Sequence, residues 1–240
     1  MNHSKLFYDR KSINLDITFR CTLQCPNCMR QYLYAAQNKK VKGADMPMKH
    51  FKMLVDKFDE IVFCGTISDP IFHPHFIDML VYLKEQNKLA RVVTAASHKS
   101  YDWYNNAFAA NTDAIWTFGL DGLPKDSHKY RINQDGEKLF EVMKLAPNPK
   151  WKYIVFKYNE NDIDQARQLA KDNNIKFNTV LMKKSPSTPS VVGANAPFKR
   201  VLPSAPIIPS VPSIPVTDSP GVGHAPPILG PKISFDVVLM

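Results

Sequence analysis

Three cysteines, Cys21, Cys25 and Cys28, lie within eight residues in the run Cys-Thr-Leu-Gln-Cys-Pro-Asn-Cys. Thiolates bind iron and zinc, and a loop that carries three of them can wrap around one metal centre. Pro26 has no backbone N–H, so it delays the start of a helix within this run. Three thiolates on a [4Fe–4S] cubane leave the fourth iron open to a cofactor or substrate, whereas an electron-transfer cluster has four cysteine ligands. The spacing therefore predicts a metal centre with an open coordination position.

Structural zinc is the alternative, with three cysteines and one histidine as ligands. His73 and His75 are the nearest histidines that follow a predicted strand, although their position beside Pro74 at a helix start favours capping or surface roles. Zinc ligands usually come as two close pairs, and no second pair of matching spacing follows. The remaining cysteine, Cys64, lies in an apolar run and is expected to pack as a small hydrophobic residue.

Runs with the period of a strand alternate with runs that have the period of a helix. The predicted strands are Ile13–Thr18, Ile61–Gly65, Arg91–Ala95, Ala114–Leu120, Lys152–Tyr158 and Lys176–Met182. The predicted helices are Met48–Phe58, Phe76–Lys84, Tyr101–Ala109, Gly136–Leu145 and Asp162–Asn173. This order predicts an α/β fold of parallel strands joined by right-handed crossovers, either a (β/α)6 partial TIM-type barrel or an open sheet. The site should lie at the carboxyl ends of the strands, where the polar motifs fall.

The cysteine run, with Asn14–Arg20 as a first strand and its exit, resembles the signature Cys-x3-Cys-x2-Cys of the radical S-adenosylmethionine (SAM) superfamily. The resemblance covers about residues 10–182. It implies that Cys21, Cys25 and Cys28 bind a [4Fe–4S] cluster and that SAM binds at the open iron. It also implies the (β/α)6 partial barrel.

Segments after the next three predicted strands are similar to further motifs of that superfamily. Phe63–Pro70 resembles its Gly-Gly-Glu-Pro segment, which binds the methionyl amino group of SAM. Thr94-Ala-Ala-Ser97 resembles a Thr-Asn-Gly-Ser-like run, and Phe118–Gly122 looks like Ser-Leu-Asp-Gly, with Gly119 in place of the serine. The contacts with SAM that these similarities imply are Gly65, Ser68, Asp69, Thr94 and Asp121.

Two further contacts with SAM follow from the same resemblance. Arg131 lies where relatives carry an arginine that pairs with the SAM carboxylate, a match that guanidinium geometry favours. The fifth predicted strand ends in Asn159-Glu160, similar to the branch that includes peptide-modifying enzymes and the molybdenum-cofactor cyclase. Asn159 is the expected contact on the adenosyl side. Asn27 stands where relatives often carry a larger residue near adenine.

The resemblance implies reductive cleavage of SAM to a 5′-deoxyadenosyl radical, which abstracts hydrogen from a substrate. A peptide or protein is the first expectation for this substrate, and a nucleoside or small metabolite is the second. An electron donor such as flavodoxin or ferredoxin is the expected partner. The alternative is a non-catalytic iron–sulfur or zinc-binding adaptor protein with a degenerate radical SAM domain, because Asn27, Ala95, Ala96 and Gly119 depart from the motifs.

Composition limits the other classes of function. The formal charge is +9, yet the densest basic cluster, Lys39, Lys40 and Lys42, is short, which disfavours nucleic-acid binding. No apolar run approaches the roughly 20 residues that cross a membrane, and no signal peptide is apparent, so a cytoplasmic protein is expected.

The C-terminal part differs in composition, since 12 of the 19 prolines lie between Pro186 and Pro231. We predict a radical SAM core domain over residues 1–184 and a disordered, Pro-rich tail over 185–240. Two roles are open for the tail: it recruits a protein partner, or it is mobile and has no function of its own. Its apolar end, Ile233–Met240, could pair with a sheet edge or cover the open side of the barrel. The tail carries no cysteines for auxiliary clusters, which disfavours the peptide-modifying relatives that use them.

Overall fold

The computed structural model describes residues 11–37, 41 and 43–181, which fall within one compact unit. Six parallel strands form one sheet in the order β1 to β6, so that β1 and β6 are its edges and the sheet is not closed. The strands are β1 (Ser12–Leu15), β2 (Glu60–Phe63), β3 (Leu89–Thr94), β4 (Ile115–Gly119), β5 (Lys150–Val155) and β6 (Lys176–Leu181). The predicted partial TIM-type barrel is thus confirmed. The predicted tail over 185–240 lies outside the described residues, and its boundary stays a prediction.

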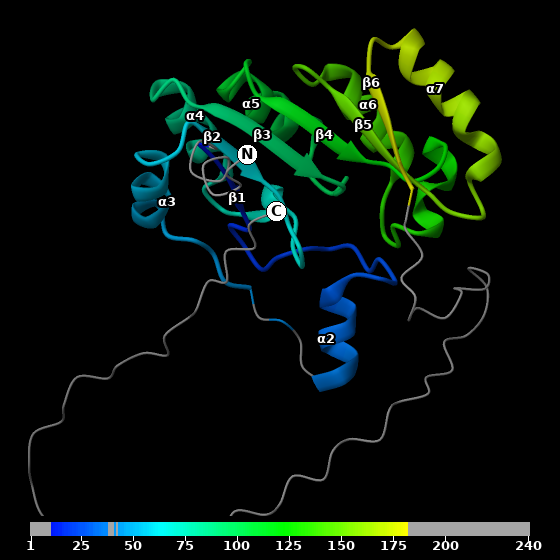
Figure 1. Ribbon diagram of the computed structural model, residues 1–240, viewed down its shortest axis with the longest axis horizontal. Coiled ribbons are helices and arrows are strands. Elements are labelled where there is room, and N and C mark those ends of the chain that lie inside the picture. Colours follow the sequence, from blue (N-terminus) through cyan, green and yellow to red (C-terminus); the bar gives the residue numbers. More distant parts are fainter. Residues whose placement is uncertain (1–10, 38–40, 42, 182–240) are drawn as a thin grey trace, which may run out of the picture. The chain divides into compact units, whose positions relative to one another are not determined.

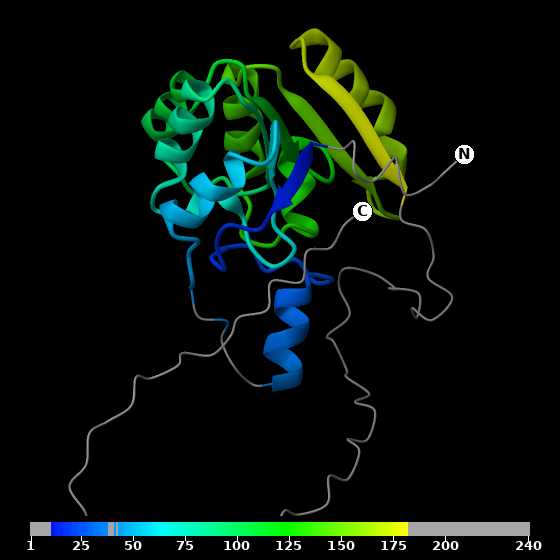
Figure 2. The same ribbon diagram turned by 60° about the vertical axis from the view of Figure 1, so that its left-hand side comes forward.

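Five α-helices connect consecutive strands, one in each crossover. They lie on the outer side of the curved sheet (Figures 1 and 2). They are α3 (Met48–Val55), α4 (Phe76–Glu85), α5 (Tyr101–Ala110), α6 (Gly136–Leu145) and α7 (Ile163–Asp172). Short 3-10 turns, η1 (Pro70–Phe72), η2 (Pro124–Lys129) and η3 (Glu160–Asp162), lie in connections that follow strands at the carboxyl edge. Ser100 and Asp135 cap α5 and α6 by accepting hydrogen bonds from Trp103 and Lys138.

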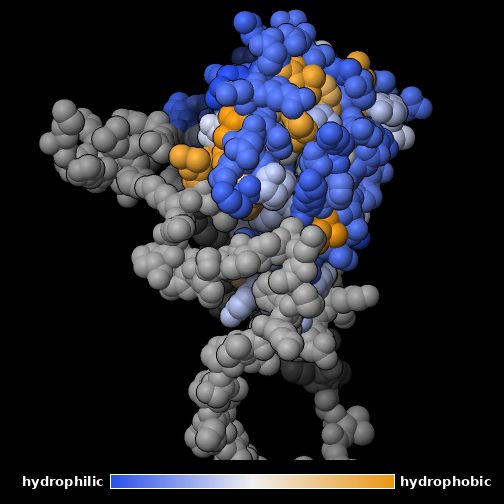
Figure 3. Space-filling view, turned by 90° about the vertical axis from the view of Figure 1, so that its right-hand side faces the viewer, coloured by the Kyte–Doolittle hydropathy of each residue, from blue (hydrophilic) through white to orange (hydrophobic). Residues whose placement is uncertain are grey.

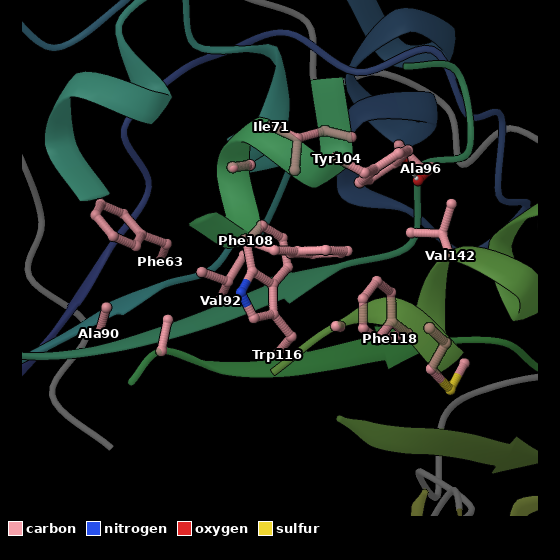
Figure 4. Packing of buried hydrophobic residues seen from close by; sticks show 14 of the residues in the cluster. Phe63, Ile71, Ala90, Val92, Ala96, Tyr104, Phe108, Trp116, Phe118 and Val142 are labelled. Atoms are coloured by element: carbon pink, nitrogen blue, oxygen red, sulfur yellow. Dashed lines mark hydrogen bonds between the residues drawn. The ribbon is translucent and has the colours of Figure 1, made fainter. Parts of the chain in front are cut away.

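The core fills the space between the outer face of the sheet and these helices. Buried aromatic side chains dominate it, and Figure 4 shows Trp116 of β4 beside Phe108 of α5, with ring centroids 4.9 Å apart. Phe76 of α4 meets the same indole edge-on at 6.1 Å. Large rings in edge-to-face contact bury much apolar area and also fix the packing geometry. This core holds the strands in register, so that their carboxyl ends meet at one edge.

The opposite, concave side of the sheet is here called the inner face. Residues alternate between the faces along each strand, and the inner-face residues are half-buried where their outer-face neighbours are fully buried. Val62, Val93, Thr117 and Lys152 belong to the inner face. The outer face is therefore a packed core, whereas the inner face is only partly covered by described residues.

The first predicted strand is too long, because the chain leaves the sheet after Leu15. Thr18 forms an isolated antiparallel bridge with Asp45, and Phe19 N–H donates to the Ala44 carbonyl over 2.8 Å. Helix α2 (Met29–Gln37) was not predicted, and the apolar side chains that the structure describes on it, Met29, Tyr32, Leu33 and Tyr34, are exposed or half-buried. The helix begins directly after Cys28, whose carbonyl accepts from the amides of Gln31 and Tyr32.

The surface over α7 and β6 is mostly hydrophilic, with apolar groups between polar ones (Figure 3). Within the described ranges, no helix combines the length and the apolar character needed to cross a membrane.

Candidate cofactor site at the carboxyl edge of the sheet

The three predicted ligand cysteines lie together on the loop between β1 and α2. Cys25 is buried, and Cys21 and Cys28 are half-buried beside it. A turn closes the loop, because Cys28 N–H donates to the Cys25 carbonyl over 3.0 Å. Leu23, Ala95 and Tyr130 pack around the thiols. The sequence thus brings three cysteines into one small apolar cluster at the edge where the strands end.

Hydrogen bonds from the connection between β4 and α6 fix this loop. Gln24 N–H donates to the Ile132 carbonyl over 3.1 Å, and Asn133 Nδ2 donates to the Thr22 carbonyl over 3.2 Å. Thr22 Oγ1 lies 2.9 Å from His98 Nδ1, in the loop after β3. The loop is therefore held from two neighbouring connections rather than by its own turn alone.

Burial favours the protonated form of two of these thiols, Cys21 and Cys25. It raises the pKa of Cys21 to about 12, and the nearby Asp69 carboxylate adds to the rise. Burial also raises the pKa of Cys25, although the positive charge of Arg131 opposes that rise. A metal centre must displace these protons, so loading with iron should release protons and become harder at low pH.

The three thiols are not gathered around a single point in this structure. Within the part of the chain that the structure describes, no three His, Cys, Asp or Glu side chains are grouped closely enough for one metal ion. A cubane tolerates a wider spread, since each thiolate binds a different iron. His73 is not free to act as a fourth ligand, because one ring nitrogen lies 2.9 Å from the Met46 carbonyl and the other accepts from His75 N–H. Within the described residues, a zinc site that combines the three cysteines with His73 is therefore not assembled.

Asp69 joins the loop after β2 to the end of β3. Its buried carboxylate accepts from Thr94 Oγ1 at 2.8 Å and from the amides of Ala95 and Ala96 at 2.8 and 3.1 Å. The amide of Ile71 donates to it as well, at 3.3 Å. The polar atoms of Asp69 and Thr94, both predicted contacts of SAM, are thus engaged with the protein. In this structure they position the site.

Asp121 joins the end of β4 to β5 and holds Arg131. Its carboxylate accepts from Ile154 N–H and from Arg131 Nε, each over 2.7 Å, and it is fully buried. Gly122 follows at φ +136°, a backbone conformation that favours glycine. Asp121 therefore orients the guanidinium of Arg131, which lies at the same edge as the cysteine loop.

Gly119 makes room for Arg131. A Cβ atom at this position would lie 2.9 Å from Arg131 Nη2, closer than carbon and nitrogen atoms approach without a shift. The serine that the superfamily motif carries would meet the guanidinium here. Glycine at position 119 thus suits the observed position of the Arg131 side chain. The loss of the motif's serine does not by itself indicate a degenerate site.

Gly65 and Ser68 form a tight turn after β2. A Cβ atom on Gly65 would lie 2.0 Å from the Ser68 carbonyl oxygen, so that only glycine fits without rebuilding the turn. Asp16, just beyond β1, accepts hydrogen bonds from Thr66 N–H at 2.9 Å and from the Ser68 hydroxyl. The Thr66 carbonyl lies 4.0 Å from Cys28 Sγ, which places this turn beside the cysteine loop.

Three positioning residues were missed by sequence reasoning. Gln134 Nε2 donates to the carbonyls of Ala95 and Gly119, at 2.5 and 2.9 Å, and so joins the ends of β3 and β4. Arg30 donates to the Phe19 and Ile67 carbonyls, and Asp16 binds the Gly65–Ser68 turn. Asp16 lies in the quoted Asn14–Arg20 segment, but Arg30 and Gln134 lie just outside motifs and had no distinguishing signal.

Asn159, the predicted contact on the adenosyl side, makes its side-chain hydrogen bonds within the loop that follows β5. Its Oδ1 accepts from Phe156 N–H at 2.7 Å and its Nδ2 donates to the Ile154 carbonyl at 3.0 Å. The residue is fully buried and closes the loop after β5. A contact with the adenosyl group stays a prediction. The aromatic ring of Phe156 from the same loop packs on Tyr130, with centroids 4.2 Å apart, next to the cysteines.

Comparison with solved structures shows that the fold of this chain occurs in SuiB from Streptococcus suis. SuiB from Streptococcus suis has a TM-score of 0.58 and 14% sequence identity over 74% of this chain and 41% of SuiB. The structure of SuiB bound to S-adenosylmethionine has a TM-score of 0.59 and 13% sequence identity, over 74% of this chain and 42% of SuiB. These likenesses show a shared fold, and the chain spans less than half the length of SuiB.

One curated protein also matches in sequence. The tungsten-containing aldehyde ferredoxin oxidoreductase cofactor-modifying protein of Pyrococcus furiosus is 27% identical over 119 residues, which are 48% of this chain. The match covers 32% of that relative, so the chain spans about a third of its length. No family model matches the chain.

Proposed function

We propose that this protein is a radical SAM enzyme. A [4Fe–4S] cluster would supply an electron that cleaves SAM to methionine and a 5′-deoxyadenosyl radical, and that radical would abstract hydrogen from the substrate. The observation that carries the proposal is the position of Cys21, Cys25 and Cys28. They share one loop at the carboxyl edge of a six-stranded partial barrel, next to Arg131 and the Gly65–Ser68 turn.

The roles of the residues follow from their contacts. Cys21, Cys25 and Cys28 would hold three irons of the cluster. Arg131, fixed through Nε by Asp121, has its terminal nitrogen Nη2 beside Gly119 and can pair with the carboxylate of SAM. Leu23, Ala95 and Tyr130 exclude water from the thiols. The turn from Gly65 to Ser68 offers polar groups to the amino end of SAM at the same edge.

The substrate is proposed by analogy with the proteins that match. SuiB has been solved with a precursor peptide, SuiA, and covers 72% of this chain, which supports a peptide or protein substrate. The name of the Pyrococcus relative describes modification of a cofactor, which supports the second expectation, a small metabolite. A flavodoxin or ferredoxin would deliver the electron.

Anaerobic reconstitution of the full chain tests the proposal. With iron, sulfide and reductant, the protein should bind about four irons, as one cubane requires. Added SAM should then yield 5′-deoxyadenosine, measured by chromatography and mass spectrometry. Iron binding without this product would favour a non-catalytic iron–sulfur adaptor protein. Tetrahedral zinc binding by the three cysteines and a histidine would favour a zinc-binding adaptor protein.

A further inference from the structure

The inner face of the sheet carries an excess of positive charge on β5 and its neighbours. Trp151 and Tyr153 are fully buried in the outer core, so the alternation of a strand places Lys150, Lys152 and Ile154 on the inner face. Lys176 of β6 is in register with Lys150. In-register residues of neighbouring strands present their side chains on the same face, so these lysines line one surface.

Lys152 lies level with the cofactor site. Its register partner on β4 is Gly119, the residue whose absent Cβ makes room for Arg131. Burial raises the pKa of the Cys64 thiol after β2 and of the Asp121 carboxylate after β4, and the positive charge of Lys152 is close enough to both groups to oppose that rise. Lys152 is therefore a half-buried inner-face residue within electrostatic range of groups at the carboxyl edge.

The inner face offers little negative charge to balance these lysines. Arg91 of β3 takes Glu60 of β2 as its ion-pair partner. Burial and the like charges of Arg91 and Lys176 lower the pKa of Lys150, and the Glu60 carboxylate only partly opposes them. Among the side chains that the structure describes, Lys152 makes no ion pair. The Asp121 carboxylate, which the charge of Lys152 reaches, is already paired with Arg131. A half-buried ammonium that makes no ion pair favours an anionic ligand.

The remaining inner-face residues on the central strands are mainly apolar. Val62, Val93, Ile115 and Ile154 are half-buried there, with Thr117 between them. Such a surface suits a ligand whose apolar part lies against the aliphatic side chains and whose charged end reaches Lys152.

We propose that the substrate of this protein carries an anionic group, a carboxylate or a phosphate, and that Lys152 binds it on the inner face. This inference rests on the proposed function, because it concerns the substrate of that reaction. The binding of an anion at Lys152 can nevertheless be measured without SAM cleavage. Lys152 is here a specificity-determining residue that selects the substrate by charge.

Calorimetric titration of the reconstituted full chain with two probes, glutarate and pyrophosphate, tests the proposal. At least one probe should bind, and Lys152→Gln should weaken that binding about tenfold, as expected for a charge-assisted hydrogen bond. Lys152→Arg should restore it. Lys171→Gln, which removes an exposed lysine near the end of α7, should leave the affinity unchanged. Preference for glutarate would indicate a carboxylate, and preference for pyrophosphate a phosphate.

The proposal is overturned if neither probe binds or if the two glutamine variants weaken binding equally. It is also overturned if Lys152→Gln lowers the affinity for SAM as much as the affinity for the probe, because Lys152 would then serve the cofactor. Thermal unfolding of each variant checks that the fold is intact, and the arginine variant keeps the test valid if the glutamine variant unfolds. Probe binding without SAM cleavage would remove the proposed enzymatic function alone.

Discussion

The outer core and the carboxyl edge of the same sheet are built in different ways. The outer core depends on shape: Trp116, Phe108 and Phe76 meet ring against ring with little polar bonding. The carboxyl edge depends on hydrogen bonds, because Asp69 joins β2 to β3 and Asp121 joins β4 to β5. We expect changes in the outer core to cost the most folding stability. Changes at the carboxyl edge should cost less stability but should also impair the site. The difference separates residues that make the fold from residues that make the site.

Removing the central indole should have the largest effect on stability. Trp116→Ala would open a cavity among packed aromatic rings and lower the free energy of unfolding by about 3–5 kcal/mol. Urea denaturation measures this loss. The control, Met53→Ala, truncates an exposed side chain on α3 and should change the free energy by no more than about 0.5 kcal/mol. Similar losses in both variants would show that the outer core does not hold the fold as described.

Truncating the polar link between β2 and β3 should have a smaller effect on stability. Asp69→Ala leaves the buried amides of Ala95 and Ala96 without an acceptor, which should cost about 1–3 kcal/mol. Affinity for SAM should fall in the same variant, because the loop after β2 is no longer held against the end of β3. Asp78→Ala, on the exposed start of α4, is the control. Unchanged stability with lost SAM binding would instead indicate a direct contact between Asp69 and the cofactor.

These two regions also differ in how well the sequence predicts them. Helix α6 has the bounds that its periodicity indicates, and all six strands were located, because alternating and helical apolar patterns record burial directly. The edge was predicted only in part. Spacing and motif bring the cysteines, Gly65, Asp121 and Arg131 to one place, but a sequence pattern does not show whether a buried carboxylate contacts a cofactor or a neighbouring backbone amide.

Neutralising the guanidinium should separate cofactor binding from cluster binding. Arg131→Gln removes the charge that we assign to the SAM carboxylate, so the affinity for SAM should fall about tenfold or more. Iron content should stay at the wild-type level, since the thiols remain. Equilibrium dialysis with labelled SAM and an iron assay give the two values. Arg167→Gln, in an exposed ion pair on α7, should change neither. Loss of iron from the Arg131 variant would contradict its assignment to SAM.

The smallest expected effect is a pH dependence that arises at His73, outside both regions. Burial lowers the pKa of His73 below its ordinary value of 6.5, so the unfolded chain binds a proton more readily than the folded one. The stabilising contribution is present above about pH 6.5 and is lost as the pH falls toward the folded pKa. Other groups that face His73 are Asp45, His75 and Arg20.

Urea denaturation of wild type and His73→Gln, at about pH 7.5 and about pH 5.5, isolates this contribution. The stability of the wild-type protein should fall more on acidification than that of the variant, and a variant of the exposed His128 should behave like wild type. An equal fall in wild type and His73→Gln would show that His73 does not titrate differently in the folded state.

The central claim, that one loop of three cysteines at this edge supports SAM cleavage, is tested most directly by comparing two cysteine variants. Cys25→Ala removes the buried ligand of the loop, whereas Cys64→Ala removes the cysteine that lies outside it. Each is reconstituted anaerobically, reduced and supplied with SAM, and 5′-deoxyadenosine is measured. We expect the Cys64 variant to form the product at the wild-type level and the Cys25 variant to form none above background. Unchanged product formation by the Cys25 variant would contradict the account.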